Sequence, residues 1–182
     1  MILIIGGDSQ IGYSFYNYIK KKDLNVIKTT RNLNRINKDT IYFNLENPKF
    51  EKNFLTNISS AYIFAGISKI KYCENHKKIS YLVNFINTRK TIKILLKNNI
   101  KTFFASTSKV FGIHSKFPHE NSKKNPQNYY AFLKLKIEQE FYNNQLFVVL
   151  RLGKVLQNNF IKTILNKNLV QKNTYKISKD FY

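Results

Sequence analysis

Short apolar runs alternate with helical stretches along most of the chain, and this alternation is the feature that most constrains its fold. Strand-like runs are predicted at residues 1–5, 25–30, 40–45, 61–66, 101–107 and 146–152. Helices are expected between them at residues 10–22, 79–97 and 132–144. Apolar strands separated by helices indicate a parallel sheet covered on both faces. We therefore predict an α/β fold with a doubly wound parallel sheet, in which ligands bind at the carboxyl ends of the strands.

The chain has 182 residues, which is enough for one domain with a sizeable core. A short helix at residues 158–168 and one more strand are expected in the tail. No apolar run approaches the length of a membrane span, and MILIIGG is too short for a signal peptide. The single cysteine, Cys73, excludes an internal disulfide and fits a cytoplasmic protein.

The formal net charge of +21 would, by itself, point to a nucleic-acid binder. Nearly all of this charge is Lys, however, and the lysines are scattered along the chain. The chain is also rich in Asn, Ile, Phe and Tyr, which share A/T-rich codons with Lys. Compositional drift therefore explains the charge, and we do not favour a nucleic-acid partner. The chain has three histidines, His76, His114 and His119. None has a Cys or acidic neighbour at metal-ligand spacing, so no metal site is expected.

A glycine turn, GGDSQIG at residues 6–12, joins the first predicted strand to the first helix. Such a turn lets the backbone approach a phosphate, and the helix N-terminus supplies free N–H groups. A plain strand-to-helix turn is the alternative. The segment resembles the G-x-x-G-x-x-G turn of the extended short-chain dehydrogenase/reductase family, and SQIG is similar to the dTDP-4-dehydrorhamnose reductase type. The resemblance assigns Gly6, Ser9, Gln10, Ile11 and Gly12 to cofactor binding, with Ser9 in place of the middle glycine.

The second predicted strand ends in KTTRN, residues 28–32, where dinucleotide folds usually have an acid that holds the adenosine ribose. Arg31 can pair with a 2′-phosphate instead, and Thr29 or Thr30 can hydrogen-bond to it. This favours NADP as the cofactor, with NAD as the alternative. The alternative role for Arg31 is that of an ordinary solvated arginine in a basic protein. The resemblance adds the residues after the third and fourth strands: Asn44, Leu45, Ala65 and Gly66.

Tyr130 and Lys134 lie four residues apart, which places both on one face of a helix. The same spacing occurs at three other Tyr/Lys pairs, but only this pair follows a hydroxyl-bearing strand end, ASTSKVFG, and a proline at position 126. The order resembles the family's P-x-x-x-Y-x-x-x-K segment. The resemblance implies that Thr107 holds the substrate oxygen, that Tyr130 supplies the proton, and that Lys134 lowers the tyrosine pKa and reaches the nicotinamide ribose. Glu138 fills the family's acidic place, and Asn84 is expected to make a backbone bond.

The resemblance implies an NADP-dependent oxidoreductase that acts on a nucleotide sugar, of the 4-keto sugar reductase or epimerase type, in the synthesis of surface polysaccharide precursors. Residues 1–170 are predicted to form the NAD(P)-binding Rossmann domain and residues 171–182 the start of a truncated substrate lobe, since family members continue well beyond this length. A homodimer through residues 80–97 and 131–143 is the further partner that the resemblance implies. A non-catalytic or inactive dinucleotide-binding module is the alternative, and a nucleic-acid-binding protein is a further one.

Overall fold

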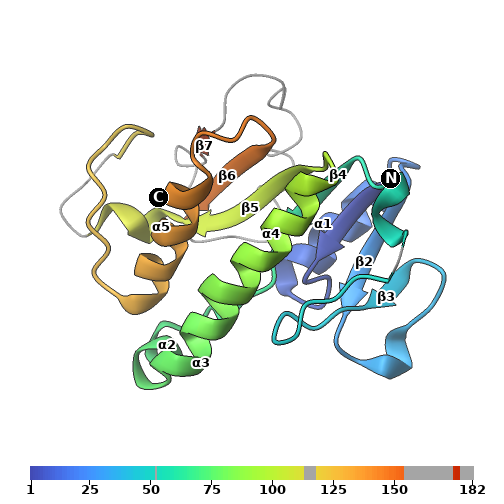
Figure 1. Ribbon diagram of the computed structural model, residues 1–182, viewed down its shortest axis with the longest axis horizontal. Coiled ribbons are helices and arrows are strands. Elements are labelled where there is room, and N and C mark those ends of the chain that lie inside the picture. The colour runs from blue at the N-terminus through green and yellow to red at the C-terminus, as the bar shows by residue number, and fades with distance from the viewer. Residues whose placement is uncertain (52, 113–117, 154–173, 177–182) are drawn as a thin grey trace.

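Seven parallel strands form one sheet in the order β3-β2-β1-β4-β5-β6-β7 (Figure 1). The computed structural model describes residues 1–51, 53–112, 118–153 and 174–176. The strands are β1 (Ile2–Ile5), β2 (Val26–Thr30), β3 (Thr40–Tyr42), β4 (Ser60–Ile63), β5 (Lys101–Thr107), β6 (Phe147–Leu152) and β7 (Thr174–Lys176). The strand order reverses between β1 and β4, as in a doubly wound Rossmann fold. The predicted fold class is confirmed, and β7 is the extra strand expected in the tail.

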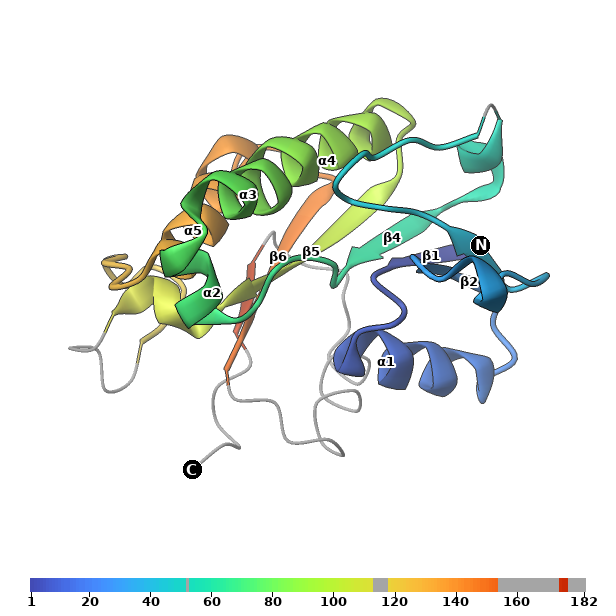
Figure 2. The same ribbon diagram turned by 90° about the horizontal axis from the view of Figure 1, so that it is seen from below.

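Helices cover both faces of this sheet, as Figure 2 shows: α1 lies on one face, and α3, α4 and α5 lie on the other. The helices are α1 (Gln10–Lys20), α2 (Ile70–Asn75), α3 (Lys77–Tyr81), the π-helical turn η3 (Leu82–Asn87), α4 (Thr88–Lys97) and α5 (Tyr129–Phe141). The described residues also form three short 3-10 turns: η1 (Leu33–Arg35), η2 (Phe54–Asn57) and η4 (Ser108–Phe111).

The core has two layers because successive residues of a strand point to opposite faces of the sheet. On β1, Leu3 and Ile5 pack into the cluster under α4 and α5, whereas Ile4 packs into the cluster under α1 with Phe15 and Ile19. All five side chains are at most 1% exposed. The strands are therefore packed from both sides, and this packing fixes the positions of their carboxyl ends.

Several predicted bounds shift by a few residues for local reasons. The helix predicted at residues 132–144 is α5, which begins at Tyr129 because the Asn128 side chain caps it by accepting from the backbone N–H of Ala131 at 2.9 Å. The third strand ends at Tyr42, because the chain turns at Asn44, whose side chain accepts from the N–H of Glu46 at 2.9 Å. The predicted helix at residues 158–168 and the domain boundary at residue 170 lie outside the described residues.

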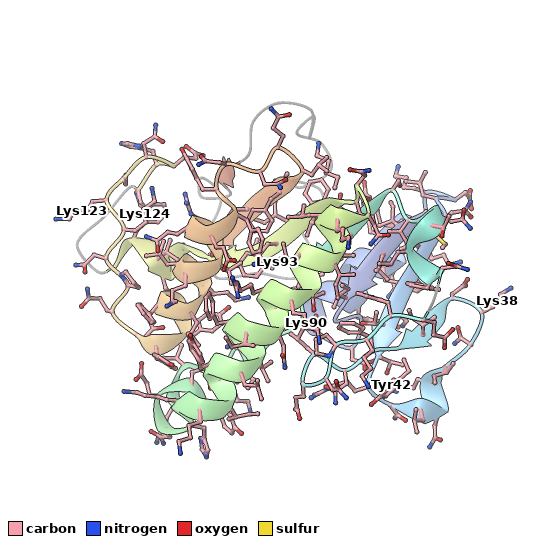
Figure 3. The ribbon with its side chains drawn as sticks, in the orientation of Figure 1. Lys38, Tyr42, Lys90, Lys93, Lys123 and Lys124 are labelled. Atoms are coloured by element: carbon pink, nitrogen blue, oxygen red, sulfur yellow. The ribbon has the colours of Figure 1, made fainter. Side chains whose placement is uncertain are left out.

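The surface carries its positive charge at separate places. Figure 3 labels Lys38 beside β3, Lys90 and Lys93 on α4, and Lys123 and Lys124 in the segment before α5; these positions do not form one patch. Within the described ranges, no helix is long and apolar enough to cross a membrane.

Candidate functional site

A cleft of about 530 Å³ opens at the carboxyl ends of β1, β2 and β4, where the strand order reverses. Open α/β sheets bind their ligands at this point. The lining includes most of the residues that the sequence assigned to a cofactor: Gly6, Ser9, Thr30, Arg31, Asn44, Leu45, Ala65 and Gly66. Segments more than 50 residues apart in the sequence thus meet at one edge of the sheet. Among the same set, Gln10, Ile11, Gly12 and Lys134 are not in the lining.

The glycine turn is tight enough to require glycine at two positions. Gly6 has a positive φ of 95°, and a Cβ on it would lie 2.5 Å from the backbone nitrogen of Ala65. A Cβ on Gly12 would lie 2.2 Å from the carbonyl oxygen of Gly6. The turn therefore folds back on itself and brings the start of α1 close to the ends of β1 and β4.

Ser9 has a structural role at the start of α1. Its hydroxyl donates to the carbonyl oxygen of Gly6 at 2.7 Å and accepts from the backbone N–H of Gly12 at 3.0 Å. Serine therefore replaces the family's middle glycine and serves as the helix N-cap. Among the described residues, the backbone N–H groups of Gln10 and Ile11 have no acceptor, as expected for the first turn of a helix. These groups fit an anion such as a pyrophosphate.

The two threonines at the end of β2 are already engaged. The Thr29 hydroxyl accepts from the backbone N–H of Gly6 at 2.9 Å, and the Thr30 hydroxyl donates to the Asp8 carboxylate at 2.6 Å. The sequence suggested Thr29 or Thr30 as a donor to a 2′-phosphate, and in the structure the Thr30 hydroxyl already donates to Asp8. Arg31 makes a 3.7 Å ion pair with Glu46, which also lines the cleft. Asp8 was missed as a site residue, although its place in the glycine turn, two residues after Gly6, shows that it follows the end of the first strand.

Asn84 fixes the segment that follows β4. Its side-chain oxygen accepts from the backbone N–H of Ile67 at 2.8 Å, and its amide nitrogen donates to the carbonyl oxygen of Ile67 at 2.9 Å. The expectation that Asn84 bonds to backbone is confirmed. Asn84 is 2% exposed and belongs to the π-helical turn η3, a feature often found at functional sites. The wall of the cleft formed by Gly66 and Ile67 is therefore held by a side chain from a distant helix.

Tyr130 and Lys134 lie at the start of α5, as predicted. The Lys134 ammonium lies 5.7 Å from the centroid of the Tyr130 ring, and it lies 3.9 Å from the place where a Cβ on Gly66 would be. Burial lowers the pKa of Lys134 to about 8, although Glu138 and Cys73 act in the opposite direction. The helix thus brings Lys134 to the wall of the cleft.

The Tyr130 pKa differs from the sequence-based expectation. Burial raises the pKa of Tyr130 to about 12, and the nearby Cys73 acts in the same direction. The sequence predicted that the Lys134 ammonium lowers this pKa. The expectation failed because both groups are withdrawn from water, and desolvation disfavours the charged form of each. Tyr130 is therefore a neutral phenol at neutral pH.

Thr107 ends β5 and caps the next turn. Its hydroxyl accepts from the backbone N–H of Lys109 at 3.3 Å, and the residue is 6% exposed. Among the described residues, it makes no hydrogen bond to Tyr130 or Lys134. Thr107 lies on β5, the same strand as Ala105, whose carbonyl oxygen accepts a hydrogen bond from the Lys134 ammonium. The predicted catalytic groups are thus close in the fold but, among the described residues, Thr107 does not hydrogen-bond to the other two.

A buried ion pair joins α5 to β6. Glu138 accepts from the guanidinium of Arg151 on β6 at 2.7 and 3.0 Å, and it also accepts from the Ser106 hydroxyl. Arg151 donates further to the carbonyl oxygen of Glu120 at 3.2 Å. Glu138 and Arg151 are 3% and 7% exposed. Because α5 also carries Tyr130, this network fixes the tyrosine helix against the sheet. In the part of the chain that the structure describes, no group of three or more His, Cys, Asp or Glu residues is arranged to hold a metal ion.

The family described as "RmlD substrate binding domain" matches residues 1–182, the whole chain. The chain belongs to this family. The match confirms the resemblance to extended short-chain dehydrogenases/reductases that the glycine turn and the tyrosine helix indicated. A comparison with curated proteins gives no match.

Several solved structures with the same fold carry sugar-nucleotide enzyme names. A hypothetical dTDP-4-dehydrorhamnose reductase from Sulfolobus tokodaii is 21% identical, with a TM-score of 0.72 over 85% of this chain and 56% of that chain. The dTDP-4-dehydrorhamnose reductase from Yersinia enterocolitica is 26% identical, with a TM-score of 0.65 over 84% of this chain and 52% of that chain. The UDP-glucose 4-epimerase complex with NAD from Thermus thermophilus is 18% identical, with a TM-score of 0.65 over 82% of this chain and 54% of that chain. This RmlD-family chain therefore spans about half the length of the structures it matches.

Proposed function

We propose that this chain is the dinucleotide-binding part of an NAD(P)-dependent oxidoreductase that acts on a nucleotide sugar, of the 4-keto sugar reductase or epimerase type. Synthesis of surface polysaccharide precursors is the proposed setting. The observation that carries the proposal is the cleft at the reversal of strand order, which gathers the glycine turn, the end of β2 and the turn after β4. Lys134, from the tyrosine helix, is not in the lining, but its ammonium lies 3.9 Å from the place that a Cβ on Gly66 would occupy.

A nicotinamide dinucleotide fits these residues. The pyrophosphate would lie against Gly6 and the start of α1, where the N–H groups of Gln10 and Ile11 lack acceptors in the described structure. A Cβ at Gly6 or Gly12 would clash with the backbone of Ala65 or of Gly6 and would displace the turn that forms this site. The adenosine would lie toward the end of β2 and the turn after β3, and the nicotinamide half would pass the small residues after β4. The lining residues proposed for these two halves are Ser9, Thr30, Arg31, Asn44, Leu45, Ala65 and Gly66.

The proposed chemistry is proton and hydride transfer at a sugar carbonyl. The dinucleotide, when bound, supplies or accepts the hydride. Tyr130 would donate the proton to the carbonyl oxygen as reduction proceeds, and its raised pKa keeps that proton in place at neutral pH. Thr107 would hold the same oxygen by a hydrogen bond, and Lys134 would bind the nicotinamide ribose.

The nucleotide preference depends on the charges at the adenosine end of the cleft. Arg31 is the basis of the sequence-based choice of NADP over NAD. The Arg31 guanidinium faces Glu46, and the backbone N–H of Arg31, at the end of β2, donates to the Asp8 carboxylate. Both carboxylates line the cleft, so the choice is not decided by Arg31 alone.

We also propose a homodimer through η3 and α5. Exposed apolar side chains gather on these elements and on the adjoining end of α3: Tyr81, Leu82, Ile86 and Phe132, which are 36–43% exposed. The Lys136 ammonium lies within 6.0 Å of the ring centroids of Tyr81, Phe85 and Phe132, so the aromatic groups form one surface. Covering this surface with a second copy would remove apolar area from water.

Nucleotide binding followed by turnover tests the proposed function. The purified chain is titrated with NADH and with NADPH while nicotinamide fluorescence is followed, and the reduction of dTDP- and UDP-4-keto sugars is then measured. Saturable binding of either nucleotide and formation of a reduced sugar nucleotide are the expected results. Binding without turnover would favour the non-catalytic dinucleotide module, and binding of neither nucleotide would refute the proposal.

A further inference from the structure

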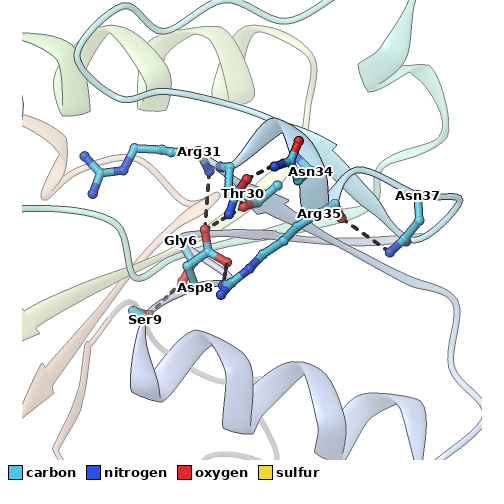
Figure 4. A network of polar contacts seen from close by, with 9 residues as sticks. Gly6, Asp8, Ser9, Thr30, Arg31, Asn34, Arg35 and Asn37 are labelled. Atoms are coloured by element: carbon cyan, nitrogen blue, oxygen red, sulfur yellow. Dashed lines mark hydrogen bonds and ion pairs between the residues drawn. The ribbon is translucent and has the colours of Figure 1, made fainter.

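The Asp8 carboxylate lies at the end of β2 although it belongs to the glycine turn (Figure 4). Three donors converge on it: the Thr30 hydroxyl at 2.6 Å, the backbone N–H of Arg31 at 3.3 Å and the guanidinium of Arg35 at 3.2 Å. These interactions outweigh the effect of burial and hold the pKa of Asp8 below its usual value. An ionised carboxylate therefore stands at the place where dinucleotide folds usually have an acid from the second strand.

Asp8 uses the donors that a 2′-phosphate would need. A phosphate at the end of β2 would have to take the Thr30 hydroxyl and the Arg31 N–H away from the carboxylate, and it would then face that carboxylate at close range. Two like charges in contact are unfavourable. The donor set that looked ready for a phosphate in the sequence is occupied by an anion of the chain itself.

Arg31 does not offset this effect. Its side chain extends away from Asp8, whereas the Arg35 guanidinium reaches the carboxylate (Figure 4). The Arg31 side chain is 72% exposed, and its nearest acid is Glu46 at 3.7 Å. Two carboxylates, Asp8 and Glu46, therefore stand near the two guanidinium groups at the adenosine end of the cleft.

A ribose with free hydroxyls suits this arrangement better. A carboxylate has room for about four hydrogen bonds, and Asp8 accepts three in the described structure. The Asp8 side chain is 37% exposed, and the residue lines the cleft together with Thr30 and Asn44. A 2′-hydroxyl can donate to the remaining position without displacing the Thr30 hydroxyl.

We propose that Asp8 is the residue that determines nucleotide specificity, accepting a hydrogen bond from the adenosine ribose so that the chain binds NAD(H) in preference to NADP(H). The inference rests on the proposed function and reverses the preference that Arg31 suggested. Asp8 reaches the ribose from the loop after β1, which is possible because β1 and β2 are neighbours and both end at the cleft.

The ratio of two dissociation constants tests this directly. The unmodified chain is titrated with NADH and NADPH at about 0.15 M salt, where long-range attraction of the basic protein for anions is largely screened. We expect NADH to bind about tenfold more tightly, the size of a hydrogen bond to a charged group. The net charge of +21 favours the more anionic NADPH, so it acts against the expected result.

Asp8→Asn removes the charge but keeps the shape and an acceptor oxygen. We expect its preference for NADH to fall about tenfold relative to the unmodified chain. Asp39→Asn is the matched control, because Asp39 pairs with Lys20 away from the cleft lining and its loss should leave the ratio unchanged. If Asp8→Asn does not fold, Asp8→Ser replaces it.

The outcomes separate the two proposals. Tighter binding of NADPH by the unmodified chain, or an unchanged ratio in the folded Asp8 variant, would overturn the role of Asp8 and leave the proposed function intact. Binding of neither nucleotide would overturn both.

Discussion

The Lys134 ammonium donates a 2.8 Å hydrogen bond to the carbonyl oxygen of Ala105, which ties the tyrosine helix to the strand that carries Thr107. Lys134 is 5% exposed, and its ammonium also lies 4.4 Å from the centroid of the Phe104 ring. This contact supplies an acceptor and a π face to a cation that has lost most of its water. It also sets the distance between α5 and β5, on which the proposed chemistry depends.

Replacing Tyr130 by Phe should abolish proton donation while leaving nucleotide binding in place. We expect the turnover of a nucleotide 4-keto sugar to fall about 100-fold or more, with the NADH dissociation constant little changed. Tyr129→Phe is the control, because this neighbouring tyrosine does not have a lysine four residues later. Equal losses in both variants would contradict the assignment of Tyr130.

The buried lysine should make stability depend on pH. The folded-state pKa of Lys134 is lowered from 10.5 to about 8, so between these values the unfolded chain binds more protons than the folded one. The free energy of unfolding should therefore rise with pH across this window. Urea unfolding at about pH 7.5 and about pH 9.5 should show a rise of about 1–2 kcal/mol that Lys134→Met removes.

Two buried tyrosines act in the opposite direction at the upper end of that pH range. Burial raises the pKa of Tyr62 and of Tyr130 from 10.0 to about 12, so the folded state binds more protons there and stability falls as pH rises through that window. Lys136→Met, on the same helix as Lys134, controls for the loss of one positive charge. The same loss of pH dependence in this control would contradict the role of Lys134.

Breaking the Glu138–Arg151 pair should destabilise the fold strongly. Glu138→Gln leaves the guanidinium of Arg151 buried without a charged partner, which costs about 3–5 kcal/mol. Glu140→Gln is the matched control on α5, because Glu140 pairs with the partly exposed Arg89 and Lys93 and should cost at most about 1 kcal/mol. Urea unfolding measures both, and similar costs would show that burial of the pair matters little.

Adding a methyl group in the glycine turn should disturb both folding and nucleotide binding. In Gly12→Ala the new Cβ would lie 2.2 Å from the Gly6 carbonyl oxygen, so the turn must move, at a cost of about 1–3 kcal/mol. In Gly153→Ala the nearest atom, the Ser108 hydroxyl oxygen, is 3.9 Å away, so the change should stay within about 0.5 kcal/mol. Unfolding and NADH titration of the two variants test this, and a Gly12 variant that binds NADH normally would contradict the proposed pyrophosphate site.

A charge on the exposed aromatic surface should prevent dimer formation. We expect the unmodified chain to sediment as a dimer and Phe132→Glu to sediment as a monomer, because a carboxylate would be desolvated in the interface. Tyr13→Glu is the control, since Tyr13 is 54% exposed on α1, on the opposite face of the sheet. A monomeric unmodified chain at micromolar concentration would refute the proposed dimer.

Much of the candidate site follows from local patterns. The glycine turn and the Tyr130/Lys134 spacing are recognisable because each motif spans only a few residues and lies at the end of a predicted strand or start of a helix. Asp8 was overlooked because the acid was sought on the second strand. Knowledge that β1 and β2 are adjacent would have placed it beside Thr30, 22 residues away in the sequence.

The sequence by itself determined the fold class, the family relationship and the order of the motifs, because hydrophobic periodicity and turn chemistry are properties of short segments. Only the tertiary structure decided the state of the groups in those motifs. It brought Asp8 to the end of β2, joined Asn84 to Ile67 and withdrew Tyr130 and Lys134 from water. Contact, burial and the pKa values that follow depend on which segments the sheet places side by side, and that arrangement is not written in any one segment.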